Sequence, residues 1–216
     1  MIISPGRRYI FIHIPKTGGT SMALALEARA MKDDILIGDT PKAIRRRRKL
    51  RAFDPENRLS KHARLADLTG LLPQGEIADM LIFTLVRNPW DRLVSYYHWL
   101  RQQRFDHPAR RIAQTHDFAA FLAHPSIARS IAEAPTSAYL TDAAGRAAPA
   151  LCLRLEHLTE DIAPLSEHLG FRPEIPLTNR SDRPNDYRAC YTDETANHVA
   201  RLCAEDIARF TYRFDP

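Results

Sequence analysis

Long apolar runs without polar alternation mark the expected strands of this chain. The two strongest cover residues 9–14 and 80–86, and shorter runs cover residues 35–37 and 151–156. β-Branched and aromatic side chains dominate the two strongest runs, as in strands that are covered on both faces. We therefore expect a sheet that lies inside the molecule, with helices against it.

Helical spacing of apolar residues follows the second strong strand. Asn88 is a good N-cap and Pro89 is a good first helical residue. The buried stripe of this helix is expected at Trp90, Leu93, Val94, Tyr97 and Leu100. Further helices are expected over residues 22–29, 64–68, 105–135, 159–169 and 193–209. Gly170 ends the helix expected over residues 159–169, and Thr192 caps the helix expected over residues 193–209. Within the helical stretch 105–135, one apolar face is formed by Phe118, Phe121 and Leu122.

A strand that runs into a loop and then into a helix occurs at both strong apolar runs, and this repetition predicts a parallel α/β sheet. In such sheets ligands bind beyond the carboxyl ends of the strands. Loop 15–21 and Arg87, which follow the two strands, are therefore expected at the same edge. With 216 residues the chain is long enough for one full core and too short for two, so we expect a single domain over residues 1–216.

Loop 15–21, between the first strand and its helix, carries the clearest chemistry. Its proline ends the strand, and Gly18 and Gly19 let the backbone turn sharply and approach a ligand closely. The helix start, where Thr20 or Ser21 is expected as the cap, presents unpaired N–H groups and a partial positive charge. An ammonium group and three hydroxyls come from Lys16, Thr17, Thr20 and Ser21. The loop suits a phosphate or a sulfate; the alternative is a glycine turn beside an ordinary surface lysine.

Two familiar nucleotide-binding motifs are absent. The triphosphate loop needs G-x-x-x-x-G-K-[ST], with the lysine after the glycines, whereas Lys16 precedes Gly18 and Gly19. The dinucleotide fingerprint G-x-G-x-x-G is also missing. A P-loop kinase of a small molecule is therefore an alternative interpretation. The chain has neither a lysine after the glycines, as that motif requires, nor identifiable magnesium-binding residues.

Residues 14–21, which read Ile-Pro-Lys-Thr-Gly-Gly-Thr-Ser, resemble the 5′-phosphosulfate loop of sulfotransferases that use 3′-phosphoadenosine 5′-phosphosulfate (PAPS), carbohydrate sulfotransferases in particular. Residues 86–97, which read Val-Arg-Asn-Pro-Trp-Asp-Arg-Leu-Val-Ser-Tyr-Tyr, are similar to the segment that binds the 3′-phosphate in that family. There an arginine is followed by a serine eight residues later, and Arg87 and Ser95 match that spacing. The alternative is a capped amphipathic helix whose arginine makes a structural ion pair.

The resemblance implies a three-layer, P-loop-like fold with a central parallel sheet flanked by helices. The chain resembles a bacterial, soluble member of the family or a catalytic domain taken alone. It implies transfer of a sulfuryl group from PAPS to a hydroxyl acceptor, with the 3′,5′-bisphosphate PAP as product and no metal required. The acceptor is expected to be a glycan or glycoconjugate. Its identity depends on the variable segments 32–73 and 105–150, and the oligomeric state stays open.

Donor-binding roles are carried over from the resemblance residue by residue. The expected nucleotide-binding residues are Lys16, Thr17, Gly18, Gly19, Thr20, Ser21, Arg87 and Ser95. In the family a basic C-terminal loop closes over the nucleotide, so Arg183, Tyr187 and Arg188 are further candidates. Lys16 is expected to be catalytic as well, because it would stabilise charge on the bridging oxygen of the leaving phosphate.

The general base is expected to be His62, which lies between the two motifs. Its placement resembles that of a histidine that takes the acceptor's proton in some carbohydrate sulfotransferases. His98 can face the nucleotide or solvent, and His13, on the buried strand, is expected to be a satisfied core residue. Glu56 and Asp67 are the nearest carboxylates that can serve instead.

Composition bounds the compartment and the partners. The net charge is +5 with a pI near 9.3, which suits an anionic ligand. The three cysteines are scattered, with no C-x-x-C, so neither a disulfide framework nor a zinc site is suggested. No signal peptide or bilayer-spanning run is recognisable, in contrast to the membrane anchor of Golgi sulfotransferases. We expect a cytoplasmic protein.

A basic run, residues 45–51, has no assigned role. Such runs are most often solvated faces, and the alternatives are a grip for an acidic substrate or for a nucleic acid backbone. Phe53 is the one aromatic residue nearby, so binding of a single strand by base stacking is not supported. A non-catalytic nucleic-acid binder is thus the third interpretation of the chain, and we expect no nucleic acid partner.

Overall fold

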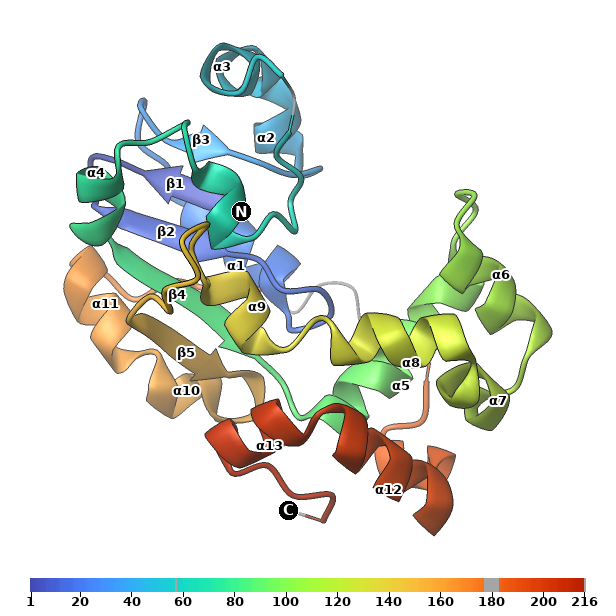
Figure 1. Cartoon of the computed structure of the whole chain (residues 1–216). Helices are drawn as coiled ribbons and strands as arrows, with labels where there is room; N and C mark the ends of the chain where they lie inside the picture. Colours follow the sequence, from blue (N-terminus) through green and yellow to red (C-terminus); the bar gives the residue numbers. More distant parts are fainter. Residues whose placement is uncertain (57, 177–182, 216) are drawn as a thin grey trace. The chain divides into compact units, whose positions relative to one another are not determined.

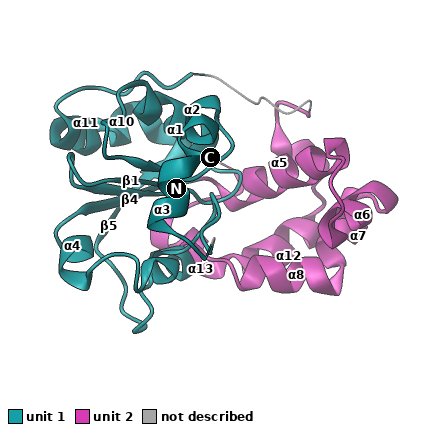
Figure 2. Ribbon diagram, turned by 90° about the horizontal axis from the view of Figure 1, so that it is seen from above, with its two compact units in different colours: residues 1–86, 137–178 teal, residues 87–136, 179–216 magenta. Residues whose placement is uncertain are grey.

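The computed structural model describes residues 1–56, 58–176 and 183–215 (Figure 1). Within it the chain forms two compact units, which Figure 2 shows in different colours. The first unit contains the sheet and consists of residues 1–86 and 137–178. The second unit is helical and consists of residues 87–136 and 179–216.

The first unit is built on a five-stranded sheet in which the strands follow the order β3-β1-β2-β4-β5. The strands are β1 (Ile2–Ser4), β2 (Tyr9–Ile12), β3 (Ile35–Leu36), β4 (Leu81–Val86) and β5 (Ala150–Arg154). The four apolar runs of the sequence correspond to β2, β3, β4 and β5. Strand β1 was not predicted, because Ile2 and Ile3 are followed at once by Ser4, Pro5 and Gly6.

Parallel pairing joins β2 to β4 and β4 to β5, so the carboxyl ends of these strands lie at one edge, as the sequence predicts. β1, in contrast, runs antiparallel to both β2 and β3. The prediction of a parallel sheet is therefore wrong at this edge. The chain returns from Ser4 to Tyr9 through a tight turn, which suffices for an antiparallel neighbour but not for a parallel crossover.

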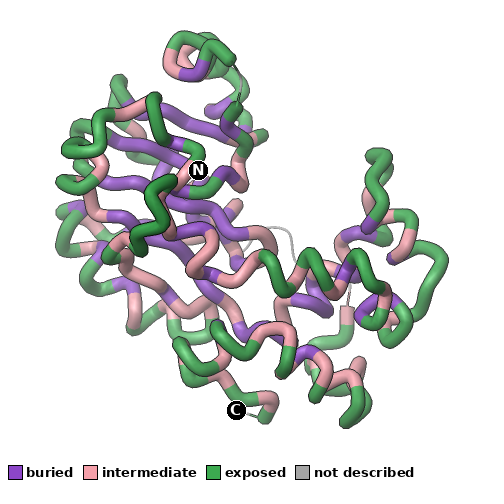
Figure 3. Tube along the Cα trace, viewed as in Figure 1, coloured by how far each residue is buried: buried purple, intermediate pink, exposed green. Residues whose placement is uncertain are grey.

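Aromatic and aliphatic side chains of one sheet face form the main core of this unit (Figure 3). Phe11 and Phe83 stack there, with ring centroids 5.1 Å apart. Met22 of α1 (Gly19–Ala28) and Leu165 of α11 (Ala163–Leu169) pack against them. This packing holds α1 in place directly after the loop that follows β2.

The opposite face of the sheet is equally buried. Ile10, Ile12 and Ile82 alternate with the residues of the first face and are almost fully inaccessible. The short helices α4 (Gln74–Ala78) and α9 (Thr136–Leu140) precede β4 and β5 in the chain. The sheet is flanked by helices, as the uniformly apolar strands predicted.

The remaining helices of the first unit are short. They are α2 (Pro41–Arg45), α3 (Arg47–Phe53), η1 (Leu65–Leu68), η2 (Leu155–His157) and α10 (Leu158–Asp161). The helix expected over residues 159–169 is two helices, α10 and α11. Pro164, in the first turn of α11, has no N–H to continue the ladder of α10. Gly170 ends α11 with a φ of 72°, as predicted.

The second unit packs around α5 (Pro89–Gln102). The Asn88 side chain accepts a hydrogen bond from the N–H of Trp90, and Pro89 occupies the first turn, as predicted. All five residues of the predicted apolar stripe are buried. Phe121 and Leu122 are buried in the same core, as their predicted apolar face requires. The other helices are α6 (Pro108–Thr115), α7 (Phe118–Ala123), α8 (Pro125–Ala132), η3 (Tyr187–Cys190), α12 (Asp193–Leu202) and α13 (Ala204–Phe210).

The last predicted helix, residues 193–209, is also divided. Thr192 caps α12 through a hydrogen bond from the N–H of Thr195, as expected. The backbone then leaves helical geometry at Cys203, where α13 begins. Within the described parts of the chain no helix is long and apolar enough to cross a membrane. The cysteines Cys152, Cys190 and Cys203 are all free thiols.

Candidate functional site

Loop 15–21 leaves β2 and turns back on itself before α1. The hydroxyl of Thr17 donates a hydrogen bond of 2.9 Å to the carbonyl oxygen of Ile14, and this side chain is buried. The Thr17 hydroxyl therefore stabilises the turn. Lys16 has a φ of +66°, in the left-handed region that a residue with a Cβ adopts only at a cost. The fold thus holds Lys16 in a strained backbone conformation at the tip of the loop.

Both glycines of the loop are required by close contacts. Gly18 has a φ of +88°, and a Cβ there would lie 2.9 Å from Cδ1 of Leu155. A Cβ on Gly19 would lie only 2.0 Å from Cδ2 and 2.3 Å from Nε2 of His13. The ring of His13 therefore rests against the backbone of the loop, and only glycine leaves room for it.

Helix α1 begins at Gly19, and Gly18 is its N-cap. The expectation that Thr20 or Ser21 caps a helix starting at Met22 is therefore wrong. The left-handed turn at Gly18 starts the helix earlier and places both hydroxyl residues inside its first turn. No side-chain hydrogen bond caps this terminus and its first turn contains no acidic residue. These features leave the positive end of a ten-residue helix suited to an anion.

His62 is fixed by a contact with the end of β2. Its Nδ1 lies 2.8 Å from the carbonyl oxygen of His13, and the two rings meet edge to face with centroids 4.7 Å apart. Since a carbonyl oxygen can only accept, Nδ1 of His62 must carry the proton. In the neutral ring this leaves the lone pair on Nε2.

Burial keeps both of these histidines neutral. It lowers the pKa of His62 to about 4, although the hydrogen bond to the His13 carbonyl acts in the opposite direction. Burial lowers the pKa of His13 to about 2. The expectation that His13 is a buried residue is confirmed, since its exposed fraction is 6%. At neutral pH the pair carries no charge, and Nε2 of His62 is available to accept a proton.

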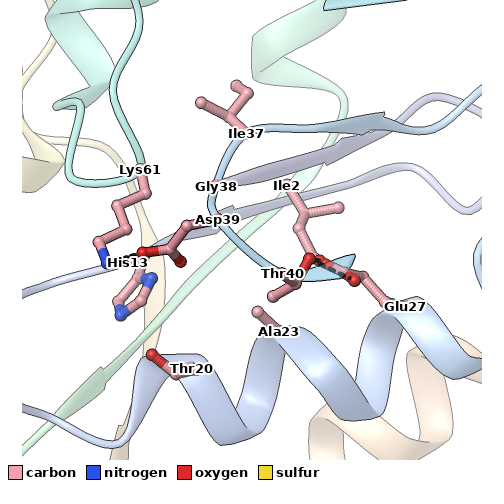
Figure 4. Close-up of a pocket in the computed structure, with 10 residues that line it drawn as sticks. All are labelled: Ile2, His13, Thr20, Ala23, Glu27, Ile37, Gly38, Asp39, Thr40 and Lys61. Atoms are coloured by element: carbon pink, nitrogen blue, oxygen red, sulfur yellow. Dashed lines mark hydrogen bonds and ion pairs between the residues drawn. The ribbon is translucent and has the colours of Figure 1, made fainter. Parts of the chain in front are cut away.

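A pocket adjoins the loop on the side of α1 (Figure 4). Thr20 points into it from the first turn of α1, toward the ring of His13. Asp39 and Lys61 form its opposite wall, joined by an ion pair of 2.6 Å. Partial burial acts to raise the pKa of Asp39, but the hydrogen bond and the charge of Lys61, with smaller contributions from a backbone hydrogen bond and His62, together outweigh it, and the pKa lies below its ordinary value. The pocket thus offers a hydroxyl, an imidazole, a carboxylate and an ammonium group.

The inner end of this pocket is closed by Glu27 and Thr40. The Thr40 hydroxyl lies 2.7 Å from both carboxylate oxygens of Glu27, and both residues line the pocket. Burial raises the pKa of Glu27, against the effect of this hydrogen bond. Thr40 also accepts the N–H of Ala43 and caps α2. The pocket wall and the start of α2 are therefore one structural element.

In the second unit, Arg87 is held by a carboxylate that sequence reasoning did not single out. Asp91 accepts from Nε of Arg87 at 2.8 Å and pairs with its Nη2 at 2.6 Å. The other oxygen of Asp91 accepts a short hydrogen bond from Arg183. One carboxylate therefore pairs with two guanidinium groups. The structural ion pair considered for Arg87 does exist.

Ser95 lies one turn beyond Asp91 on α5 and is buried. The i, i+4 spacing that brings Arg87 to Asp91 also brings Asp91 to Ser95 on one face of the helix. The spacing of Asp91 from Arg87 and Ser95 could have indicated that Asp91 belongs to this site. Its contact with Arg183 could not be found in this way, because the two residues are 92 positions apart.

Tyr187 and Arg188 have partners of their own within the second unit. The hydroxyl of Tyr187 donates to the carbonyl oxygen of Phe214 at 2.6 Å. The guanidinium of Arg188 forms hydrogen bonds of 2.8 to 3.1 Å with both carboxylate oxygens of Asp186. These contacts order the segment before α12, and a role of either residue in nucleotide binding stays a prediction.

The alternative bases have other surroundings. Asp67 accepts the N–H of Arg64 at 2.7 Å and caps η1. Glu56 is exposed and pairs with Arg58 at 3.5 Å. His98, on α5, contacts the ring of Tyr97. Among the residues that the structure describes, no three His, Cys, Asp or Glu side chains gather in a way that would hold a metal ion.

In a comparison with models of protein families, the chain matches the model described as Sulfotransferase family over residues 1–213. Neither the curated proteins nor the solved structures gave a match. The matched range covers both compact units, so it includes the loop before α1 as well as Arg87 and Ser95.

Proposed function

The chain belongs to the sulfotransferase family, and from this premise we propose that it transfers a sulfuryl group from PAPS to a hydroxyl of a glycan or glycoconjugate. As part of this proposal, residues 1–216 act as one sulfotransferase domain with a three-layer, P-loop-like fold. The free cysteines support a reducing, cytoplasmic location.

The N-terminus of α1 supports an anionic donor. Its first-turn N–H groups have no side-chain cap, and Gly18 and Gly19 let the backbone come close to a phosphate. We propose that these groups, with the hydroxyls of Thr20 and Ser21, bind the 5′-phosphosulfate. The Thr17 hydroxyl is already used by Ile14, so Thr17 would contribute through its backbone alone.

Lys16 is proposed as the catalytic cation. Sulfuryl transfer, like phosphoryl transfer, moves a group with diffuse negative charge between two oxygens that lie in line. Charge grows on the bridging oxygen of the leaving phosphate as the bond breaks, and an ammonium placed there stabilises the transition state more than the ground state. The strained backbone of Lys16 supports this role, because strain of this kind tends to be kept at functional sites.

His62 is proposed as the general base. The hydrogen bond from its Nδ1 to the His13 carbonyl sets the tautomer, so Nε2 can take the proton of the acceptor hydroxyl while the hydroxyl oxygen attacks sulfur. The pKa of about 4 keeps His62 unprotonated at neutral pH. It also makes His62 a weak base, which suits a transition state in which the proton leaves late.

Arg87 and Ser95 are proposed to bind the 3′-phosphate of the donor, with Arg183 as a further ligand. The position of Asp91 fits phosphate binding by Arg87 and Arg183 only in part. A bound phosphate would have to share the two arginines with the Asp91 carboxylate. Guanidinium groups suit this ligand, because their N–H donors match two oxygens of a phosphate. The pocket lined by Thr20, Asp39 and Lys61 is the proposed entry for the acceptor hydroxyl.

The observation that carries this proposal is the uncapped helix terminus with Lys16 before it and the neutral His62 beside it. The test is incubation with PAPS labelled in its sulfur and a panel of glycans, followed by separation of labelled products. Transfer to at least one glycan hydroxyl is expected. A second measurement compares thermal unfolding with PAP and with AMP, since a ligand that binds only the native state raises its stability. No transfer and no stabilisation by PAP would refute the proposal.

A further inference from the structure

One short segment carries more positive charge than the net positive charge of the whole chain. Residues 41–53 contain five arginines and two lysines and no aspartate or glutamate, whereas the whole chain has a net charge of +5. Without this segment the chain would be slightly acidic. Charge that is gathered in this way creates a local positive potential, which a charge spread evenly over the surface would not.

Three cations of the segment fasten it to the rest of the first unit. Lys42 donates to the carbonyl oxygen of Glu27 at the end of α1. Arg46 donates to the carbonyl oxygen of Met31 at 2.7 Å, and Lys49 to that of Lys32 at 2.5 Å. With the bond between Thr40 and Glu27, these contacts hold α2 and α3 against α1 and the loop after it.

The other four cations are presented to solvent. Arg45, Arg47, Arg48 and Arg51 are exposed. Among the described residues none of these four has a carboxylate within 4.0 Å, the limit for an ion pair. On α3 the spacings of three and four residues place Arg47, Arg48 and Arg51 on one side of the helix. The segment therefore separates cations that anchor it from cations that are left for a partner.

The segment begins at the wall of the pocket. Asp39 and Thr40 line the pocket, and Thr40 is the N-cap of α2 (Figure 4). Lys61 lines the same pocket from the chain that returns after α3. The surface of α2 and α3 therefore begins beside the pocket, and a polymer whose acceptor hydroxyl lies at the pocket would pass along these helices.

We propose that α2 and α3 form a docking surface for an anionic polysaccharide, a glycan with carboxylate or sulfate groups, and that Arg45, Arg47, Arg48 and Arg51 bind those groups. The proposal rests on the proposed function for the identity of the pocket. Guanidinium groups suit this partner because their donors match the two oxygens of a carboxylate or sulfate. Phe53 is the one aromatic residue of the segment, which speaks against stacked nucleic acid bases. Its one large exposed apolar side chain, Ile44, offers little to a membrane.

The test measures binding in the absence of nucleotide. Titrations use polygalacturonate and dextran sulfate, with neutral dextran, polyuridylate RNA and phosphatidylserine vesicles as competing classes. The variant changes Arg45, Arg47, Arg48 and Arg51 to Gln. The control changes Arg104, Arg129, Arg201 and Arg209 to Gln; these are exposed arginines of the second unit, so both variants lose the same charge. Thermal unfolding of each variant checks the fold.

The chain should bind at least one of the two anionic polysaccharides and not neutral dextran. The four-arginine variant should lose roughly 30-fold in affinity, with a shallower salt dependence, while the control changes by less than about 3-fold. Equal losses in both variants would overturn the proposal, as would tighter binding of RNA or vesicles. Thermal unfolding of the same variants with PAP distinguishes failure of the docking surface from failure of the proposed sulfotransferase function. If PAP stabilises them and the arginines do not matter, only the docking surface is wrong; if PAP has no effect, the proposed function fails while the surface can stand.

Discussion

His62 donates the proton of its Nδ1 to the carbonyl oxygen of His13, 2.8 Å away. The acceptor is a backbone atom at the end of β2, on the chain that leads directly into loop 15–21. The orientation of the proposed base is therefore set by the strand that also carries the proposed donor loop. A change in the conformation of the loop backbone should therefore change the orientation of the His62 ring, and a change at His62 should alter the conformation of the loop.

The pH dependence of turnover should report the low pKa of His62. A base is active in its unprotonated form, so lowering its pKa from an ordinary value of about 6.5 to about 4 extends activity toward acid. We expect kcat/KM to stay level from pH 8 down to about pH 5 and to fall tenfold per pH unit below the pKa. Initial rates at saturating PAPS and with acceptor well below its KM, in buffers of constant ionic strength, measure this. A midpoint near pH 6.5 would contradict the burial of the base.

Replacement of Lys16 by Ala should reduce turnover far more than nucleotide binding. The ammonium is proposed to act on charge that develops only as the leaving group departs, and such a loss appears in kcat. We expect kcat to fall by about 100-fold or more, with PAP affinity reduced much less. Single-turnover rates at saturating PAPS, together with calorimetric titration of PAP, separate the two effects. Normal turnover in this variant would remove Lys16 from the mechanism.

Substitution of Gly19 by Ala should disturb both the loop and His13. The new Cβ would lie 2.0 Å from a ring atom of His13, so the ring or the loop must move. Overpacking of this kind costs about 1–3 kcal/mol, which corresponds to several degrees in Tm. Gly75→Ala is the matched control, because its Cβ has no atom within 4 Å and its φ is not positive. Differential scanning calorimetry should show a loss for Gly19→Ala that Gly75→Ala does not share.

Local features of the fold could be predicted from the sequence. The cap at Asn88, Pro89 in the first turn and the buried stripe of α5 all depend on residues within a few positions of one another, and all are confirmed. The same holds for the strands of the apolar runs. The start of α1 was placed too late, because Gly18 adopts a left-handed backbone that glycine permits but that the sequence does not require, and the helix then begins at Gly19.

Contacts between distant residues could not be predicted. His62 was selected by its placement, but its bond to the His13 carbonyl spans 49 positions and has no sequence signal. The requirement for glycine at position 19 was assigned to a ligand, whereas the structure adds the ring of His13 as a reason. Asp91 stands within a recognised motif, yet its bond to Arg183 becomes visible only when the second unit is folded.

Arg87 should decide the preference for a nucleotide with a 3′-phosphate. Arg87 pairs with Asp91, and the 3′-phosphate is proposed to bind the same guanidinium group. Charge-assisted hydrogen bonds contribute about 1.5–3 kcal/mol each, so PAP should bind at least tenfold more tightly than AMP. Arg87→Ala should bring PAP close to AMP and leave AMP affinity unchanged, which is the internal control. In this variant Asp91 keeps Arg183 as its partner, so Arg183 is not expected to restore the preference by itself. Calorimetric titration of both nucleotides with both proteins measures the difference, and equal affinities in the unaltered protein would show that Arg87 serves the fold alone.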